Sequence, residues 1–250
     1  DNSPNVLSSY TDLLDSAGML YEVFDTANSN NEPDLSTLQA YPLVIWFTGD
    51  EWGGFAGPGS SGEAALGSYI EAGGHLLLSS QDYLYDNGLT PFGQTYLGIA
   101  SFDSDVNQST VTGEDIFDSI GSVSLSFPFS NWSDEVNPAT DAFLTFDGSA
   151  GNAAVRKDGE HGGSALFFGF PIITLPEESQ SLLIAEVMNW VGDTPEPCPA
   201  DCNGDGFVNV SDLLSIIEAW GTSAGCDINA DGIIDVIDLL AAVGAWGACP

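Results

Sequence analysis

The first 100 residues alternate between helical and strand-like spacing of their apolar side chains. Apolar residues from Val6 to Ala17 recur at helical intervals, with Ser3 placed to cap that helix and Pro4 suited to its first turn. The unbroken apolar runs Pro42–Phe47 and His75–Ser79 predict strands buried on both faces, as in a parallel sheet. The other elements predicted in this part are a strand at Leu20–Phe24 and helices at Leu35–Gln39 and Ser61–Ala72.

From about residue 101 the apolar runs become short and are separated by turn residues, which predicts an antiparallel extension of the sheet. These runs are Val106–Gly113, Ser122–Phe127, Phe143–Phe146, Ala153–Arg156 and Ser164–Phe168. A closing helix is predicted at Glu177–Val191, where Pro176 and two glutamates suit a helix N-terminus. We therefore expect residues 1–192 to form one flavodoxin-like α/β domain with a mostly parallel sheet.

The last fifty residues contain one short cassette twice, after a Pro-rich linker at residues 193–197. Residues 201–212 read DCNGDGFVNVSD and residues 227–238 read DINADGIIDVID, an offset of 26 positions (227 minus 201). Oxygen-bearing side chains occupy loop positions 1, 3, 5, 9 and 12, and glycine occupies position 6. This spacing suits Ca²⁺, a hard cation that takes about 6–8 oxygen ligands. Ordinary turns are the alternative, but two copies in register favour calcium loops.

Each loop runs into a single apolar helix, and position 12 is Asp rather than the Glu of an EF-hand. The prolines of residues 195–199 exclude a helix before the first loop. A loop followed by one helix, repeated, resembles a dockerin domain over about residues 198–250. The resemblance implies a small all-α module that binds two calcium ions and docks onto a cohesin-like protein. It implies side-chain ligands at Asp201, Asn203, Asp205, Asn209, Asp212, Asp227, Asn229, Asp231, Asp235 and Asp238, and carbonyl ligands at Phe207 and Ile233.

Loop positions 10 and 11 often contact the partner in that family, and here they are Val210-Ser211 and Val236-Ile237. Because the two pairs differ, the two copies are not expected to present identical surfaces. The apolar residues that follow are expected to form a small core, with some left available for a partner. The expected core residues are Leu213, Leu214, Ile216, Ile217, Trp220, Leu239, Leu240, Val243 and Trp246.

All four cysteines lie in or beside this repeat, and an even number in so small a region predicts disulfides and an oxidising compartment. Zinc is the alternative, but no histidine is nearby and the cysteine spacing does not form CxxC pairs. Dockerin termini lie close together, so the resemblance pairs Cys198 with Cys249. Cys202 and Cys226 are then left to pair with each other.

The first domain carries the runs YPLVIWFTGDEWGG, YIEAGGHLLLSSQD and ALFFGFP, which resemble a class I glutamine-amidotransferase-like domain over residues 1–192. In active members a cysteine follows the strand that corresponds to His75–Ser79. Here that turn is Ser79-Ser80-Gln81-Asp82, without cysteine, so we expect a non-catalytic domain. Ser80 with His161 is the hydrolytic alternative, although a nucleophile also needs an adjacent base and an orienting group.

Other residues with chemical potential lie near the predicted strand ends. Asp50, Glu51 and Asp82 follow the two buried strands, where open α/β sheets bind ligands. A ligand or cation pocket is one reading, and a solvated acidic rim is the reading we expect. Arg156 and Lys157 are the only two basic residues and are expected to be an exposed strand-end pair.

The charge balance is strongly acidic, with 37 acidic residues, two basic ones and a formal net charge of −35. Nucleic acid is excluded as a natural partner, because phosphate binding requires Lys and Arg. No apolar run approaches the roughly 20 residues of a membrane span. We expect a secreted or cell-surface protein without catalytic activity. The alternatives are a subunit of a calcium-stabilised assembly, in which the partner is a neighbouring copy, and an extracellular hydrolase that uses sheet-end residues.

One strand is missing from the expected pattern. In the amidotransferase-like family an apolar strand precedes the first helix and lies centrally in the sheet. Without it, Leu20–Phe24 and Pro42–Phe47 would flank an empty position, and unpaired buried backbone groups cost about 1–3 kcal/mol each. We expect a cleaved upstream piece, a strand of a neighbouring chain or a rerouted strand of this chain to fill the position.

Overall fold

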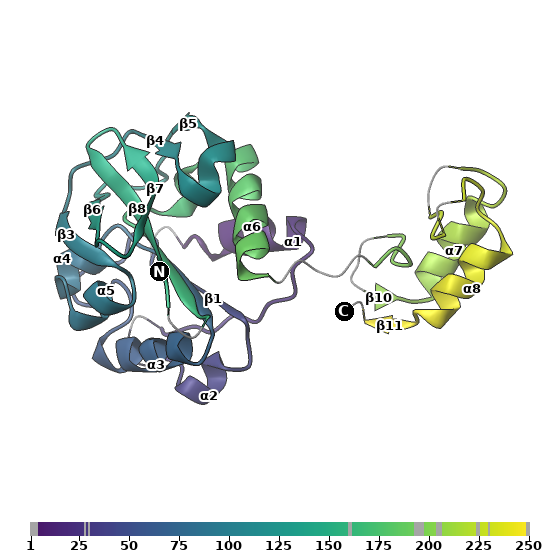
Figure 1. Ribbon diagram of the computed structural model, residues 1–250, viewed down its shortest axis with the longest axis horizontal. Coiled ribbons are helices and arrows are strands. Elements are labelled where there is room, and N and C mark those ends of the chain that lie inside the picture. Colours follow the sequence, from purple (N-terminus) through teal and green to yellow (C-terminus); the bar gives the residue numbers. More distant parts are fainter. Residues whose placement is uncertain are drawn as a thin grey trace. The chain divides into compact units, whose positions relative to one another are not determined.

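The computed structural model of this protein describes residues 5–27, 29, 31–159, 162–192, 198–203, 207–223, 226–229 and 231–248. The chain divides into two compact units. Residues 1–13 and 22–193 form the first, and residues 194–250 with residues 14–21 form the second. Figure 1 shows an α/β domain in the first unit and a helix pair in the second. The predicted linker at residues 193–197 lies outside the described residues.

A seven-stranded sheet with the order β1-β2-β9-β8-β7-β4-β5 runs through the first unit. Its strands are β1 (Leu43–Phe47), β2 (His75–Ser79), β9 (Ser164–Phe168), β8 (Gly151–Asp158), β7 (Phe143–Gly148), β4 (Thr110–Gly113) and β5 (Ser122–Ser124). β1, β2 and β9 are parallel, and the other neighbours pair antiparallel. Phe47 lies opposite Ser79, and Ser79 lies opposite Phe168. The three parallel strands therefore end at the same edge.

Apolar side chains cover both faces of the parallel strands, which explains their unbroken apolar sequences. On one face, Leu76, Leu78 and Phe167 share a core with residues of α3 (Ser60–Glu71). On the same strands, Phe168 points the other way, because successive strand residues face opposite sides. It packs there against other aromatic rings.

Two helices cover that second face, and Figure 1 shows them near each other. Tyr10 of α1 (Leu7–Ser16) stacks on the ring of Phe47. Trp190 of α6 (Glu177–Val191) makes an edge-to-face contact with His75. The smaller elements of this unit are α2 (Leu35–Leu38), α4 (Tyr83–Asn87), α5 (Pro91–Thr95), the 3-10 helices η1 (Asp115–Ile120) and η2 (Ile172–Thr174), and a separate two-stranded sheet of β3 (Ile99–Asp103) and β6 (Glu135–Pro138).

The second unit is built on α7 (Val210–Glu218) and α8 (Val236–Gly244). A short antiparallel pair, β10 (Phe207–Val208) and β11 (Gly247–Ala248), joins the beginning of the repeat to its end. Its core is small, as expected for so few residues, and its fully buried apolar side chains are Ala200, Val208, Ile216, Ile234 and Ala242. Among the described residues, no helix has the length and apolar composition needed to span a membrane.

The predicted fold class is confirmed, because an α/β domain with parallel strands and an antiparallel extension is followed by a small helical module. The predicted strand at Leu20–Phe24 is wrong. This segment is extended, but it pairs with no strand in the described chain, and Leu20 is 73% exposed. A strand exists only through its pairing, and the apolar composition of the segment could not supply a neighbour.

The prediction for Ser164–Phe168 was right about the strand and wrong about its place. It was expected in the antiparallel extension, but β9 lies inside the sheet and is parallel to β2. Its five residues are all buried. β9 also pairs antiparallel with β8, so this one strand joins the two parts of the sheet.

Candidate calcium site and docking surface

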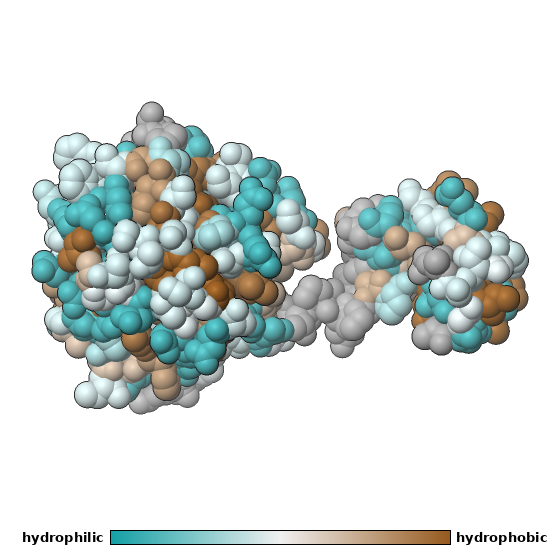
Figure 2. Space-filling view, turned by 90° about the horizontal axis from the view of Figure 1, so that it is seen from above, coloured by the Kyte–Doolittle hydropathy of each residue, from teal (hydrophilic) through white to brown (hydrophobic). Residues whose placement is uncertain are grey.

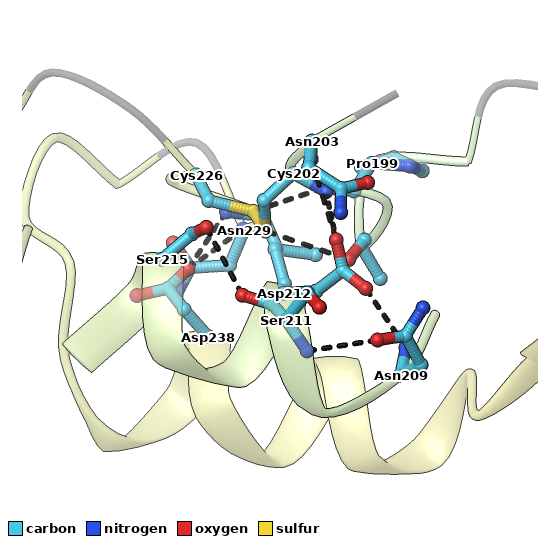
Figure 3. The surroundings of a disulfide bond; sticks show 12 residues. Pro199, Cys202, Asn203, Asn209, Ser211, Asp212, Ser215, Cys226, Asn229 and Asp238 are labelled. Carbon is cyan, nitrogen blue, oxygen red and sulfur yellow. Dashed lines mark hydrogen bonds between the residues drawn. A yellow bond between two sulfur atoms is a disulfide. The ribbon is translucent and has the colours of Figure 1, made fainter. Parts of the chain in front are cut away.

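The twelfth residue of each predicted calcium loop is a buried aspartate that ties the loop to its helix. One carboxylate oxygen of Asp212 accepts hydrogen bonds from the backbone N–H groups of Cys202 (2.9 Å) and Asn203 (3.3 Å). Its other oxygen accepts from the N–H of Asn209 at 2.8 Å, which closes a capping box at the start of α7. Figure 3 shows Asp212 pointing from its helix towards the loop.

Asp238 repeats this arrangement in the second loop. It accepts from the N–H groups of Ile228 (2.8 Å) and Asn229 (3.2 Å) through one oxygen and of Asp235 (2.8 Å) through the other. These backbone hydrogen bonds, with that from Asp235 foremost, hold the pKa of Asp238 below its usual value. The two cassettes are therefore repeats in structure as well as in sequence.

The remaining side chains of the second loop also turn towards its backbone. Asp227 accepts from the N–H groups of Asp231 (3.2 Å) and Gly232 (2.8 Å), and Asn229 accepts from Asp231 N–H at 3.0 Å. Among the described residues, no three acidic, histidine or cysteine side chains already converge on a metal position. A carboxylate has about four lone-pair sites, so these hydrogen bonds leave Asp227 and Asp231 able to bind an ion.

The donor set nevertheless fits calcium. All predicted side-chain ligands are carboxylate or amide groups, the hard oxygen donors that Ca²⁺ prefers. Asp212 and Asp238 lie against the first residues of their loops, where a position-12 carboxylate must lie to share an ion with positions 1 and 3. Asp205 lies outside the described residues, and the individual ligands remain predictions.

A disulfide bond joins the two loops. Cys202 and Cys226 are bonded, with their Cα atoms 5.4 Å apart, which is the expected pairing. Figure 3 shows the sulfur atoms between the loops, close to Asp212 and Asp238. Cys198 is also disulfide-bonded, and its predicted partner Cys249 lies outside the described residues.

The predicted core of this module is only partly correct. Ile216 is fully buried, and Leu213 and Leu239 pack against the core. α7 and α8 each bury only the face that packs against the other helix. No further helix or sheet among the described residues of this module covers their remaining apolar side chains. The residues predicted in the core but found exposed are Leu214, Ile217, Trp220, Leu240, Val243 and Trp246.

These exposed residues occupy equivalent places in both copies. Leu214 is 60% exposed and its counterpart Leu240 is 64% exposed, and Trp220 and Trp246 are exposed to similar extents. The predicted partner-binding residues at the helix starts are exposed as well. Figure 2 shows hydrophobic residues at the surface of the module. We call this set the apolar surface of the module: Val210, Leu214, Ile217, Trp220, Val236, Ile237, Leu240, Val243 and Trp246.

A second candidate site lies at the carboxyl edge of the parallel strands. Asp50 follows β1, Asp82 follows β2, and Asp134 donates its backbone N–H to the carbonyl of Gly169 directly after β9, at 2.8 Å. Asp82 and Asp134 are buried, and each has one carboxylate oxygen without a hydrogen-bond partner among the described groups. Burial raises the pKa of Asp82 to about 7 and that of Asp134 to about 9.

The expectation of a solvated acidic rim is therefore wrong for Asp82, and Glu51 is buried as well. Residues 130–134 close over this edge, where Gln81 receives a hydrogen bond from the N–H of Trp132 and donates to the carbonyl of Ser130. Asp134 was not predicted, since it lies in an irregular segment far along the chain from Asp82. The carboxyl groups of Asp82 and Asp134 can both hold protons at neutral pH.

Ser80 lies in the turn that leads from β2 into α4. Its buried hydroxyl oxygen accepts hydrogen bonds from Thr48 Oγ1 (2.7 Å) and from the N–H of Tyr83 (3.0 Å), which fixes the turn into α4. His161, its predicted partner in the hydrolytic alternative, lies outside the described residues.

The two basic side chains, Arg156 and Lys157, form ion pairs with aspartates. Arg156 bonds Asp115 (2.7 Å) and Asp158 (2.5 Å), and its guanidinium lies 4.3 Å from the ring centre of Phe143. The expectation of exposure is wrong for Arg156, because β8 directs it into the interior beside these partners. Lys157 pairs with Asp141.

Comparison with known proteins identifies the C-terminal module. Residues 199–242 match the dockerin type I domain, a family that binds calcium and docks onto protein partners such as cohesin. This module is therefore a dockerin type I domain, as its cassettes indicated. The search of the curated proteins found no match to this sequence.

Solved structures show the fold of the first domain. A β-galactosidase from Rahnella sp. R3 has a TM-score of 0.50 at 16% identity over 76% of this chain. The N-terminal domain of mmIFT52 has a TM-score of 0.50 at 15% identity, covering 76% of this chain and 91% of its own. The chain spans only 27% of the Rahnella enzyme and 22% of the β-galactosidase Gan42B. At this identity the likeness concerns the fold alone.

Proposed function

We propose that this protein is a secreted, non-catalytic α/β domain carried by a calcium-binding dockerin module that attaches it to a cohesin-like partner. The observation that carries the proposal is the apolar surface of the module, repeated at equivalent positions of both copies. Solvent exposure of so many large apolar side chains on a small module is unfavourable unless a partner covers them.

Calcium has a defined role in this proposal. Seven carboxylates are predicted to line the two loops, and their mutual repulsion is relieved when two divalent ions bind. Ion binding would also fix the starts of α7 and α8, because Asn209 and Asp235 are predicted ligands and helix caps at once. The apolar surface extends from these two helix starts, so calcium and partner binding are coupled.

The absence of catalysis is proposed from the surroundings of Ser80, whose hydroxyl is buried and bonded within its own turn. A fluorophosphonate probe, which labels activated serines, should leave the full chain unlabelled. Labelling that disappears in Ser80→Ala would contradict this part of the proposal. The two parts are independent, since docking needs only the module.

Docking is tested by titrating the full chain with cohesin modules from the same organism, with calcium and with excess chelator. Binding should require calcium. The double substitution Leu214→Asp and Leu240→Asp should weaken it at least about 100-fold, since central apolar contacts contribute about 2 kcal/mol or more each. Leu182→Asp, at an exposed leucine of α6, is the matched control and should bind normally. Unchanged binding by the double variant would refute this interface.

A further inference from the structure

The carboxyl edge of the parallel strands brings two buried aspartates together from distant parts of the chain. Asp82 follows β2, and Asp134 is held at the end of β9 by the hydrogen bond from its N–H to the carbonyl of Gly169. β2 and β9 are neighbours in the sheet. Gly169 permits this close approach, because a Cβ atom there would lie only 3.1 Å from Asp134 Cβ. Asp82 is 5% exposed and Asp134 is fully buried.

Each of these two side chains leaves one carboxylate oxygen without a hydrogen-bond partner. Asp82 Oδ2 and Asp134 Oδ2 are both buried, and neither accepts from a donor among the described residues. Most buried polar atoms in native proteins have a partner, because burial without one is unfavourable. The two oxygens therefore indicate a ligand at this edge that supplies positive charge or a proton.

Asp105 brings a third carboxyl group to the same edge. Its backbone N–H donates to Asp134 Oδ1 at 3.3 Å. Its φ of 60° lies in the left-handed region that residues other than glycine seldom adopt, and the side-chain amide of Asn107 holds this turn by donating to the carbonyl of Asp105 at 2.7 Å. Burial is the main cause of the raised pKa values of Asp82 and Asp134, and the charge of Asp105 raises both pKa values further. The three carboxyl groups are therefore close enough for their charges to repel one another.

Neither basic side chain of the protein is available to neutralise these carboxyl groups. The sequence contains one arginine and one lysine. Arg156 is paired with Asp115 and Asp158, and Lys157 is paired with Asp141. Buried carboxylates are normally paired with a positive charge or coordinate a metal ion. A formal net charge of −35 also attracts cations to the protein, so the missing positive charge is expected from solution.

We propose that the carboxyl edge of the first domain binds a hard divalent cation, with Asp82 and Asp134 as its carboxylate ligands. Both Ca²⁺ and Mg²⁺ take carboxylate oxygens, and both also accept water as a ligand. In the described part of the chain, no three acidic, histidine or cysteine side chains converge on a metal position. The ligands beyond the two carboxylates are therefore water or carbonyl oxygens, and Asp105 contributes through its nearby charge. The ion joins the turn after β2 to residues 130–134, which close over this edge.

Residue-resolved NMR of the full chain tests the proposal without any substitution at the site. The backbone amides of Asp105 and Trp132 are the reporters, because they donate to Asp134 and to Gln81, the neighbour of Asp82. Calcium chloride and magnesium chloride are titrated separately at pH 8, where fewer protons compete for the carboxylates, up to about 10 mM, which exceeds the Kd of weak extracellular calcium sites. At least one of the two ions should shift both amide signals along a saturating curve. Sodium chloride at the same ionic strength should not, since it only screens charge.

The calcium sites of the dockerin module are separated from this site by a variant. The double substitution Asp212→Asn and Asp238→Asn weakens the predicted loops of the module, and the shifts of the Asp105 and Trp132 amides should persist in it. The absence of a saturating shift with either divalent ion would overturn the proposal and leave carboxyl groups that hold protons only. Equal shifts with sodium, or shifts that disappear in the double variant, would overturn it as well.

Substitution of the two ligands gives a second, independent result. Asp134→Asn keeps an oxygen that can accept from the N–H of Asp105 but removes the charge, and Asp82→Asn removes the charge of the other ligand. Each should raise the Kd read from the Trp132 amide at least about tenfold, because ligand charge sets the affinity of such sites. Asp147→Asn, at an exposed residue of β7, is the matched control and should leave the Kd unchanged. If one ligand variant fails to fold, the other variant and the unsubstituted chain still decide, and an unchanged Kd in a folded ligand variant would overturn the assignment of that ligand pair.

Discussion

Cys202 and Cys226 cross-link the two calcium loops directly beside their first predicted ligands, Asp201 and Asp227. The bond closes a loop with a sequence separation of 24 residues. It therefore restricts the conformations of the unfolded module and fixes the distance between the two loops in the folded one. A disulfide that closes a loop of this length contributes on the order of 2–4 kcal/mol to folding stability.

The double substitution Cys202→Ser and Cys226→Ser should lower the melting temperature of the module, and more strongly in chelator than in calcium. The reason is that calcium and the disulfide restrain the same loops, so either partly replaces the other. Calorimetry of the full chain in both conditions measures the effect. An identical loss with and without calcium would show that the two restraints are independent.

The second loop should bind calcium more tightly than the first. It contains four predicted carboxylate ligands, adding Asp235, where the first loop has Asn209. In calorimetric titrations, Asp238→Asn should remove the tighter of two binding steps, and Asp212→Asn the weaker one. Glu218→Gln, at an exposed residue of α7, is the control for a lost charge and should keep both steps. Loss of the weaker step in Asp238→Asn would reverse the ranking.

Two neighbouring isoleucines of α7 should contribute differently to stability, because one is in the core and the other is at the surface. Ile216 is fully buried, whereas Ile217 is 54% exposed. Ile216→Ala should lower the free energy of unfolding of the module by about 2–4 kcal/mol, and Ile217→Ala should change it by less than about 0.5 kcal/mol. Urea unfolding in calcium measures both. Partner binding should show the opposite ranking, and similar stability losses for both variants would mean that the helix face is wrongly assigned.

The buried carboxyls at the sheet edge predict a stability that falls as the pH rises. Burial is the main cause of the raised pKa values of Asp82 (about 7) and Asp134 (about 9). The charges of Asp105, Asp50 and Asp86 raise the pKa of Asp82 further, and those of Asp82, Asp105 and Asp103 raise the pKa of Asp134. The folded protein therefore holds protons that the unfolded chain releases near pH 4.

This proton uptake sets the direction of the effect. The stabilisation is fully present below about pH 4, and it is lost as the pH rises through about 7 and then about 9. The free energy of unfolding falls by up to about 1.4 kcal/mol per pH unit for each proton. Urea unfolding in chelator at pH 5, 7 and 9 should show this decline, and Asp134→Asn should flatten it. Asp118→Asn, at an exposed residue of η1, should not. A decline of equal steepness in Asp134→Asn would contradict the prediction.

Several features were determined by the sequence itself, because their causes are local. The calcium cassettes depend on residue types at fixed positions within twelve residues, and these identified the dockerin module. The strands His75–Ser79 and Ser164–Phe168 and the helix Glu177–Val191 have the predicted bounds. A continuous apolar run and a helical period of apolar residues can both be recognised within the segment itself. The resemblance to a dockerin domain implied the pairing of Cys202 with Cys226, which the structure confirms.

Other features were decided only by the tertiary structure, because they depend on contacts between distant parts of the chain. Leu20–Phe24 has the composition of a strand, but no neighbouring strand lies beside it in the described chain. The apolar repeats after each loop did not reveal that Ile216 would be buried and Leu214 exposed, because that depends on how α7 meets α8. Asp82 and Asp134 are 52 positions apart (134 minus 82), and only the folded sheet brings both to one buried edge, where the loss of solvent raises their pKa values.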